Sequence, residues 1–183
     1  TAASLSATAG GAVTDSGTLA IAGATTISAS GQDITLDDSA STFGTLALTG
    51  VNVAVTENAA TDLGASTVSG TLGITSAGAV TDSGTLAVTG ATTISASGQD
   101  ITLDESASTF GTLALTGANV AVTDAGAVDL GASTVSGTLG ITSAGAVTDS
   151  GTLAITGATT ISASGQDITL DESASTFGTL ALT

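Results

Sequence analysis

The sequence of 183 residues contains no lysine, arginine, histidine, cysteine, methionine, tryptophan, tyrosine or proline. Most side chains that act as nucleophiles or general bases in enzymes are therefore missing. Aspartate and glutamate alone can form the carboxylate pair of a glycoside hydrolase, but no cation and only three aromatic residues are there to hold a substrate. We therefore expect no catalysis and name no catalytic or cofactor-binding residue.

The 16 acidic residues have no positively charged partners, which gives a net charge of −16. Nucleic acids and anionic membranes are bound through clustered lysine and arginine, so we expect neither as a partner. No apolar run approaches the roughly 18 residues of a membrane span, and we expect no membrane insertion. Without cysteine, the chain has no disulfide framework and no thiol chemistry, which is compatible with an exported bacterial protein.

Repetition dominates what is present. The segment GAVTDSGTLA stands at 11–20, 78–87 and 145–154, so each copy begins 67 positions after the one before it. The first two copies differ at only eight positions, which is typical of an array whose copies stack on one another. We divide this continuous array into the degenerate end of a preceding repeat at 1–10, repeats at 11–77 and 78–144, and a partial repeat at 145–183. Because the last copy breaks off, we expect an interior piece of a longer protein.

Apolar residues alternate with threonine, serine and alanine, as in Ile34/Leu36 and Leu46/Leu48, and glycine, serine, aspartate or asparagine bound each stretch. A period of two predicts short strands, and no helical stripe is present. Cutting after each turn signal divides one repeat into five short units. We therefore predict an all-β parallel β-solenoid (β-helix) with two faces, about 13 residues per coil and five coils per repeat, each repeat about 24 Å long. Merging Val68 with the strand that follows gives the alternative, a three-faced β-helix of about 22 residues per coil.

The stretches GTLAVTGATTISASGQDITL and FGTLALTGANVAVTDAGAVDLGASTVSGTLGITSAGAVTDSG resemble the repeat regions of very large bacterial surface proteins of the filamentous haemagglutinin type. The resemblance covers the chain from Gly11 onward and is one of pattern and composition. It implies an exported β-helical adhesin or filament, with coils that are typically longer than the short units described above and three-faced. It also implies a rod that spaces or displays regions of the protein that bind to the surface of a host or neighbouring cell.

The carboxylates recur at fixed places in the repeat, which raises the question of a metal. Ca²⁺ takes several oxygen ligands, and stacked turns could bring carboxylates together. Solvated turn residues that keep a rod soluble are the alternative interpretation. The glycine-rich nonapeptide of calcium-binding β-rolls is absent, and we expect no other cofactor. The weak metal candidates are Asp37, Asp38, Asp82, Asp104, Glu105 and Asp149.

Threonine is abundant at positions expected to face outward, and a flat threonine array would suggest ice binding. The outward column predicted from the short coils runs through Thr18, Asp33, Thr45, Ala60 or Asp62, and Thr71, and its charges and small residues argue against a regular lattice match. The sequence thus predicts a structural, non-catalytic extracellular rod or filament segment of a bacterial surface protein, either adhesin stalk or fibre. It would associate with itself by coil stacking, end to end or laterally. A calcium-dependent or ice-binding module is the competing class.

Overall fold

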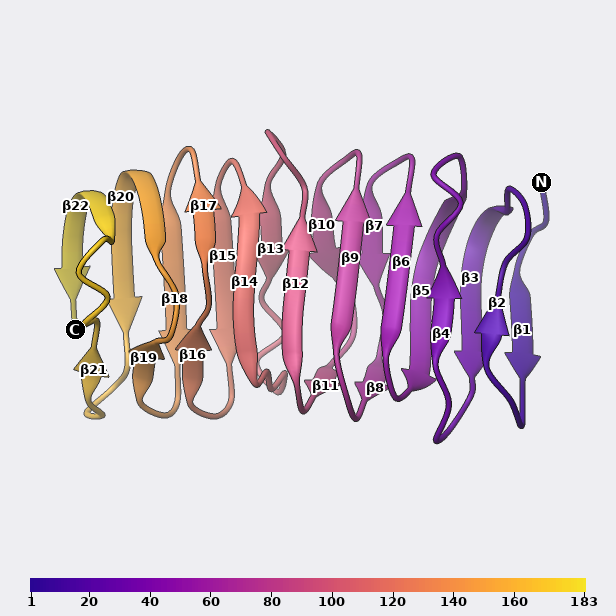
Figure 1. The fold of residues 1–183 in the computed structure, drawn as a ribbon, viewed down its shortest axis with the longest axis horizontal. Coiled ribbons are helices and arrows are strands. Elements are labelled where there is room, and N and C mark those ends of the chain that lie inside the picture. The colour runs from indigo at the N-terminus through magenta and orange to yellow at the C-terminus, as the bar shows by residue number, and fades with distance from the viewer.

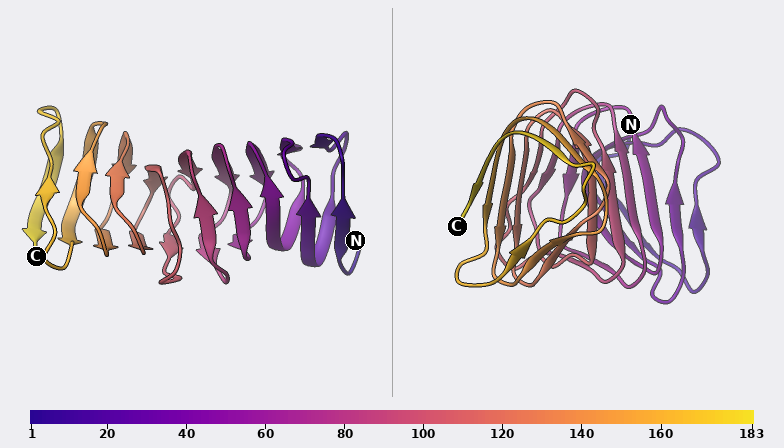
Figure 2. Two further views of the ribbon diagram at one scale, coloured as in Figure 1. Left: turned by 90° about the horizontal axis from the view of Figure 1, so that it is seen from below. Right: turned by 60° about the vertical axis from the view of Figure 1, so that its left-hand side comes forward.

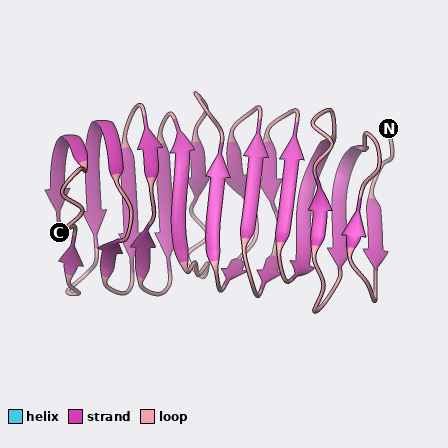
Figure 3. Cartoon of the chain, in the orientation of Figure 1, coloured by secondary structure: helices cyan, strands magenta, loops and turns pink.

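The computed structural model describes residues 1–183 and consists of 22 β-strands joined by turns, without a helix (Figure 3). Every paired strand is parallel to its partner, and the strands stack along one axis with the two termini at opposite ends (Figures 1 and 2). None of the elements is a helix with the length and apolar character that crossing a membrane requires. The predicted all-β parallel solenoid is confirmed.

Two long sheets run the length of the solenoid, and Figure 1 shows them with opposite strand directions, β6, β9 and β12 in front of β7, β10 and β13. The front sheet consists of β2 (Val13–Thr14), β4 (Ile34–Leu36), β6 (Val53–Glu57), β9 (Leu72–Ser76), β12 (Ala91–Ser95), β14 (Thr112–Gly117), β16 (Val128–Leu130), β19 (Val147–Asp149) and β21 (Ile168–Thr169). The back sheet consists of β1 (Leu5–Thr8), β3 (Ala20–Ser28), β5 (Thr42–Gly50), β7 (Thr61–Leu63), β10 (Val80–Asp82), β13 (Ile101–Leu103), β15 (Val120–Asp124), β18 (Leu139–Ser143), β20 (Leu153–Ser162) and β22 (Thr176–Leu182).

Short strands close the edges between these sheets. Where the chain passes from the back sheet to the front sheet they are β8 (Ser66–Val68) and β11 (Leu86–Val88), and at the opposite edge they are β17 (Ser133–Val135) and the first residues of β3, β5, β20 and β22. β8 and β17 each pair with the end of a long strand in the preceding turn, whose earlier residues pair with another short strand. β5 pairs with both β7 and β8, and β14 pairs with both β16 and β17. Most turns therefore contain three strands.

One turn takes about 20 residues, and the chain makes about nine turns. The shortest step in the register joins Leu46 to Leu63, and the longest joins Ala20 to Thr42. The predicted coil size of about 13 residues, with five coils per repeat, is wrong, and the alternative of about 22 residues per coil lies closer. At about 4.8 Å per turn, nine turns make a rod about 43 Å long.

The error has a physical cause in the glycines. Gly64 stands between β7 and β8, and Gly70 stands between β8 and β9. Both lie at corners between strands of the same winding, because Leu63 does not meet its partner in the next turn until Asp82. Each turn has several corners, so counting glycine-bounded units overestimates the number of turns.

The 67-residue repeat does not contain a whole number of turns. The back-sheet register runs from Ala24 through seven turns to Thr160, which lies two residues beyond Ala158, the counterpart of Ala24 two repeats later. One repeat therefore makes close to three and a half turns, about 17 Å along the axis. Equivalent strands of adjacent repeats lie in opposite sheets, as β5 at the back and β14 at the front demonstrate.

The interior is one continuous apolar column of 36 buried residues that reaches from Ile21 to Ala163. In the front sheet, Val53 pairs with Ile34 on one side and with Leu72 on the other. Alternation along each strand places these side chains inside and their neighbours outside, as the period of two predicts. Because every turn except the first and the last lies between two others, burial and the backbone ladder both depend on neighbouring turns.

Gly111 marks a close approach between successive turns. A Cβ atom at this position would lie 2.5 Å from the carbonyl oxygens of both Thr89 and Gly90 in the preceding turn. We expect Gly111→Ala to lower the free energy of unfolding by about 1–3 kcal/mol, because the backbone must shift to make room. Gly73→Ala is the matched control, since the nearest atom there is 3.8 Å away. Equal urea midpoints for the two variants would contradict the tight stacking.

Candidate functional site

The aspartate of each VTDSG segment binds the backbone of the following turn. Asp82 ends β10, and its two carboxylate oxygens accept the N–H groups of Asp104 at 2.9 Å and Glu105 at 3.4 Å. The equivalent bonds join Asp15 to the N–H groups of Asp37 and Asp38, and Asp149 to that of Asp171. These carboxylates thus satisfy backbone donors at a corner where the strand ladder is interrupted.

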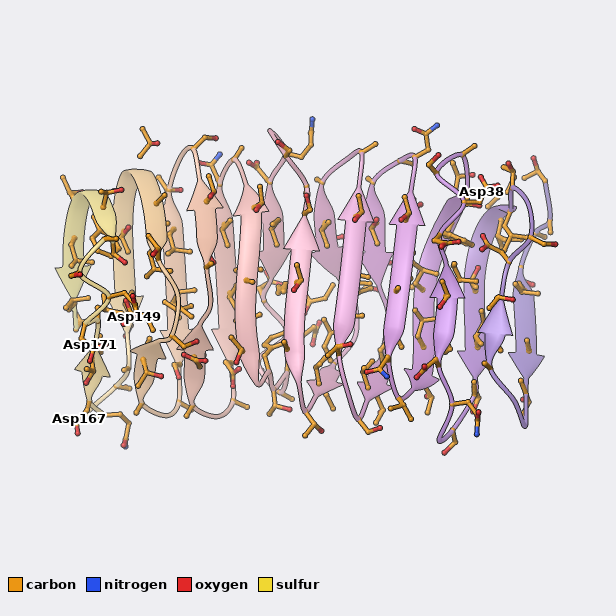
Figure 4. The ribbon with its side chains drawn as sticks, viewed as in Figure 1. Asp38, Asp149, Asp167 and Asp171 are labelled. Carbon is orange, nitrogen blue, oxygen red and sulfur yellow. The ribbon has the colours of Figure 1, made fainter.

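The metal candidates therefore fall into separate groups. Asp82, Asp104 and Glu105 lie together, whereas Asp37 and Asp38 lie beside Asp15 in another repeat. Figure 4 shows Asp149 near Asp171 toward the C-terminal end and Asp38 toward the N-terminal end. No group of three or more acidic side chains has an arrangement that could hold a metal ion. Calcium binding stays a prediction, and a comparison of melting temperatures in calcium and in EDTA tests it.

A second set of polar side chains connects three successive turns. The backbone N–H and the side-chain amide of Asn52 both donate to Asp33, at 3.1 and 3.0 Å. The carbonyl oxygen of the Asn52 side chain accepts the N–H and the hydroxyl of Thr71, both at 3.1 Å. Asp100, Asn119 and Thr138 repeat this arrangement in the next copy. Each asparagine thus links the turn before it to the turn after it through side-chain hydrogen bonds.

Asp62 plays a similar part on the back sheet. It accepts the hydroxyl of Thr45 at 2.8 Å from the preceding turn and the hydroxyl of Ser83 at 2.8 Å from the following one. Asp129 does the same with Thr112 and Ser150. A negative charge on the sheet is therefore spread over hydroxyl donors from both neighbours.

Glu57 and Asp124 are the most deeply buried carboxylates of the solenoid. Glu57 accepts the N–H of Phe43 at 2.8 Å, and its counterpart Asp124 accepts the N–H of Phe110 at 3.0 Å. Asp124 also accepts the N–H of Gly126, whereas the second oxygen of Glu57 is buried without a partner. Burial raises the pKa of Glu57 and of Asp124 above their ordinary values, and their backbone hydrogen bonds only partly oppose this. Burial likewise raises the pKa of Asp82.

A buried hydroxyl without a partner recurs in every copy. Thr25, Thr92 and Thr159 occupy equivalent positions inside the solenoid, and the Oγ1 atom of each makes no hydrogen bond. Thr92 pairs with Leu72 and Leu113 in the turns on either side. Burying a hydroxyl without a partner is unfavourable, so each of these three threonines lowers the free energy of unfolding.

We expect Thr92→Val to raise the free energy of unfolding by about 1–2 kcal/mol, because valine has the same shape and no hydroxyl to desolvate. Thr93→Val is the control, since Thr93 is exposed on the same strand. Urea denaturation measures both. A loss of stability in Thr92→Val would indicate that the hydroxyl has a partner, such as buried water.

The sequence interpretation missed Asn52, Asn119 and the buried serines. Ser108, for example, accepts the N–H of Leu86 from the preceding turn at 2.9 Å. The available signal was the recurrence of Asn52 and Asn119 next to apolar strand residues at the same place in two repeats. Their partners lie 19 residues away in either direction, so a correct turn length was needed to find them.

No pocket is found on the chain. The comparison with curated proteins and the comparison with solved structures each found no match. The model of one protein family, described as repeats of unknown function (DUF5649), matches residues 1–49, 50–116 and 117–183. Its units cover the whole chain, and the two complete ones have the 67-residue period read from the sequence, with boundaries at other points of the repeat. The chain therefore belongs to the family of DUF5649 repeats.

Proposed function

We propose that the chain is a structural, non-catalytic segment of an extracellular rod in a bacterial surface protein, which separates or displays other parts of that protein. The observation that carries the proposal is the continuity of the solenoid. Strand pairing passes without a break from β1 to β22, and a single core of 36 residues fills the interior. Because each turn is held by its two neighbours, the two ends of the rod are kept at a fixed distance from each other.

The polar side chains support the same proposal. Asp82, Asn52 and Asp62 are each engaged with the backbone or a side chain of an adjacent turn. Carboxylates of the kind that serve elsewhere as ligands or catalysts therefore have a structural use here, in holding turns together. The remaining exposed charge is of one sign, which keeps long rods apart from one another in solution.

The extracellular location rests on composition and on the resemblance to surface proteins of the filamentous haemagglutinin type. The chain offers no lysine or arginine to trypsin-like proteases. It also lacks cysteine, methionine, tryptophan and tyrosine, so the most oxidisable side chains are missing. Both properties suit a long-lived protein outside the cell.

An antibody raised against residues 1–183 tests the location on cells that produce the whole protein. We expect equal labelling of intact and permeabilised cells, and electron microscopy of the intact cells should place the label on projections from the surface. An antibody against a cytoplasmic protein of the same cells is the control, which should label only after permeabilisation. Labelling that requires permeabilisation would overturn the proposal.

One observation favours ice binding as a second candidate. With turns of about 20 residues, the outward column differs from the one expected above. A row of hydroxyls follows five successive turns along the front sheet and into β17, without a charge, through Thr56, Thr75, Ser95, Thr116 and Thr134. The row is regular at about 4.8 Å per turn, as a surface that orders water requires.

Thermal hysteresis of the chain in solution tests this candidate. If the row binds ice, Thr75→Asp should lower the hysteresis, because a charge would interrupt the row at an exposed position. Thr160→Asp, at an exposed position of the back sheet outside the row and paired with the uncharged Gly140 and Ala181, is the control. Absence of hysteresis in the unmodified chain would eliminate ice binding and leave the rod proposal untouched.

A further inference from the structure

Adjacent repeats present the same surface to opposite sides of the solenoid. Thr26, Thr93 and Thr160 are equivalent, and all three are exposed in mid-strand. Thr26 lies in β3 and Thr160 in β20, both in the back sheet, whereas Thr93 lies in β12 in the front sheet. The three positions therefore alternate back, front, back along the axis.

The hydroxyl row follows the same rule. Its part from Thr75 to Thr134 has an equivalent one repeat earlier, which runs along the back sheet through Thr8, Ser28 and Thr49 and into β8 at Thr67. The next equivalent after the front row begins at Thr142, which pairs with Ser162 on the back sheet. A side chain of any type in the repeat is thus displayed on alternating sides.

The cause is the number of turns in a repeat. A repeat that made a whole number of turns would place all copies of a residue on one side. Here the register path from Val13 reaches Asp149 after seven turns, two residues beyond Val147, the counterpart of Val13 two repeats later. Two repeats restore the side with a slip of two residues along the strand, and one repeat reverses it.

We propose that the number of repeats sets the side of the rod on which everything after the array is displayed. Loss or gain of one repeat turns the downstream part of the protein by about half a turn and moves it about 17 Å along the axis. Loss or gain of two repeats changes the length and keeps the side. The number of repeats therefore sets both the length of the rod and the side on which the downstream part is displayed. Because the copies are nearly identical, losing or gaining one leaves the contacts at the junctions unchanged.

This inference deepens the proposed function, since it describes how a rod would regulate display, but it depends only on the turn count. Deleting 78–144 joins Ala77 to Gly145, and Gly145 occupies the place of Gly78 in the repeat. All contacts across the new junction have a counterpart in the intact chain. Thr160 should then occupy the position of Thr93, in the front sheet.

Distances between spin labels test the rotation, and the absence of native cysteine permits specific labelling. A label at Thr160 is paired with one at Thr26 on the back sheet or with one at Thr14 on the front sheet. In the intact chain we expect the Thr26 pair to be the shorter, about 34 Å for seven turns. In the 78–144 deletion we expect the Thr14 pair to be the shorter, about 19 Å for four turns. The same order in both proteins would overturn the proposal.

Two controls keep the test decisive. Deleting residues 72–91 removes one turn, because Leu72 pairs with Thr92, and should leave Thr160 on the side of Thr26. In the intact chain, a label at Thr93 should be nearer to Thr14 than to Thr26, which tests the alternation without any deletion. If Thr93 lies nearer to Thr26, the turn count is wrong, whatever the location or role of the whole protein.

Discussion

Replacing Phe110 by alanine is expected to lower the free energy of unfolding by about 3–5 kcal/mol, the range for removing a buried aromatic ring. Phe110 is 5% exposed, and its N–H donates to the buried Asp124. Its equivalent Phe43 pairs with Ile21 of the preceding turn, in the last pair of a short stack of strand segments at one edge of the solenoid. The turn that follows, from Thr45 to Asp62, is among the shortest in the register. We infer that the ring fills the space that a third strand would otherwise occupy.

Urea denaturation followed by circular dichroism measures the effect of Phe110→Ala. Phe110→Leu should cost much less, since leucine keeps most of the volume. Phe177→Ala is the positional control, because Phe177 lies in the last turn and is only partly buried. If Phe110→Ala destabilises no more than Phe177→Ala, the ring does not support the interior.

Acidification from pH 7.5 to about pH 4.5 is expected to raise the melting temperature substantially. Burial raises the pKa of Glu57, Asp82 and Asp124 in the folded chain. A carboxyl whose folded pKa is raised contributes stability below its unfolded pKa of about 4, and this stability is lost as the pH rises through the folded pKa. The net charge of −16 adds a self-repulsion that protonation also relieves.

The variant Glu57→Gln tests the source of this pH dependence. Glutamine at position 57 keeps an oxygen that can accept the Phe43 N–H, carries no charge, and places its amide nitrogen where the unpartnered oxygen of Glu57 lies. We expect the variant to melt higher than the parent at pH 7.5 and to gain less on acidification. A parent chain that melts lower at pH 4.5 than at pH 7.5 would show that ionised carboxylates stabilise the fold.

The strands and the parallel solenoid could be predicted from the sequence because both follow from local pattern. Alternation in Ile34/Leu36 and Leu46/Leu48 places these side chains inside in the structure. The length of the turn could not be obtained in the same way. Since a repeat makes about three and a half turns, Leu72 meets Val53 and Thr92 and never its own equivalents. Aligning the repeats with one another therefore carries no information about which residues are stacked.

The candidate site was predictable in part for the same reason. The recurrence of Asp82, Asp104 and Glu105 identified carboxylates that the structure does bring together. Their partners are backbone N–H groups of the next turn, and finding these requires the register. Asn52 illustrates the point, because its links to Asp33 and Thr71 exist only with a step of 19 residues.

The most direct test of the turn count is the length added by each repeat. Small-angle X-ray scattering can compare the chain with versions in which 78–144 is duplicated once and twice. Three and a half turns per repeat predict that the maximum dimension grows by about 17 Å each time at constant cross-section. Growth of about 24 Å per repeat would support five short coils instead, and growth in the cross-section would contradict a single continuous solenoid.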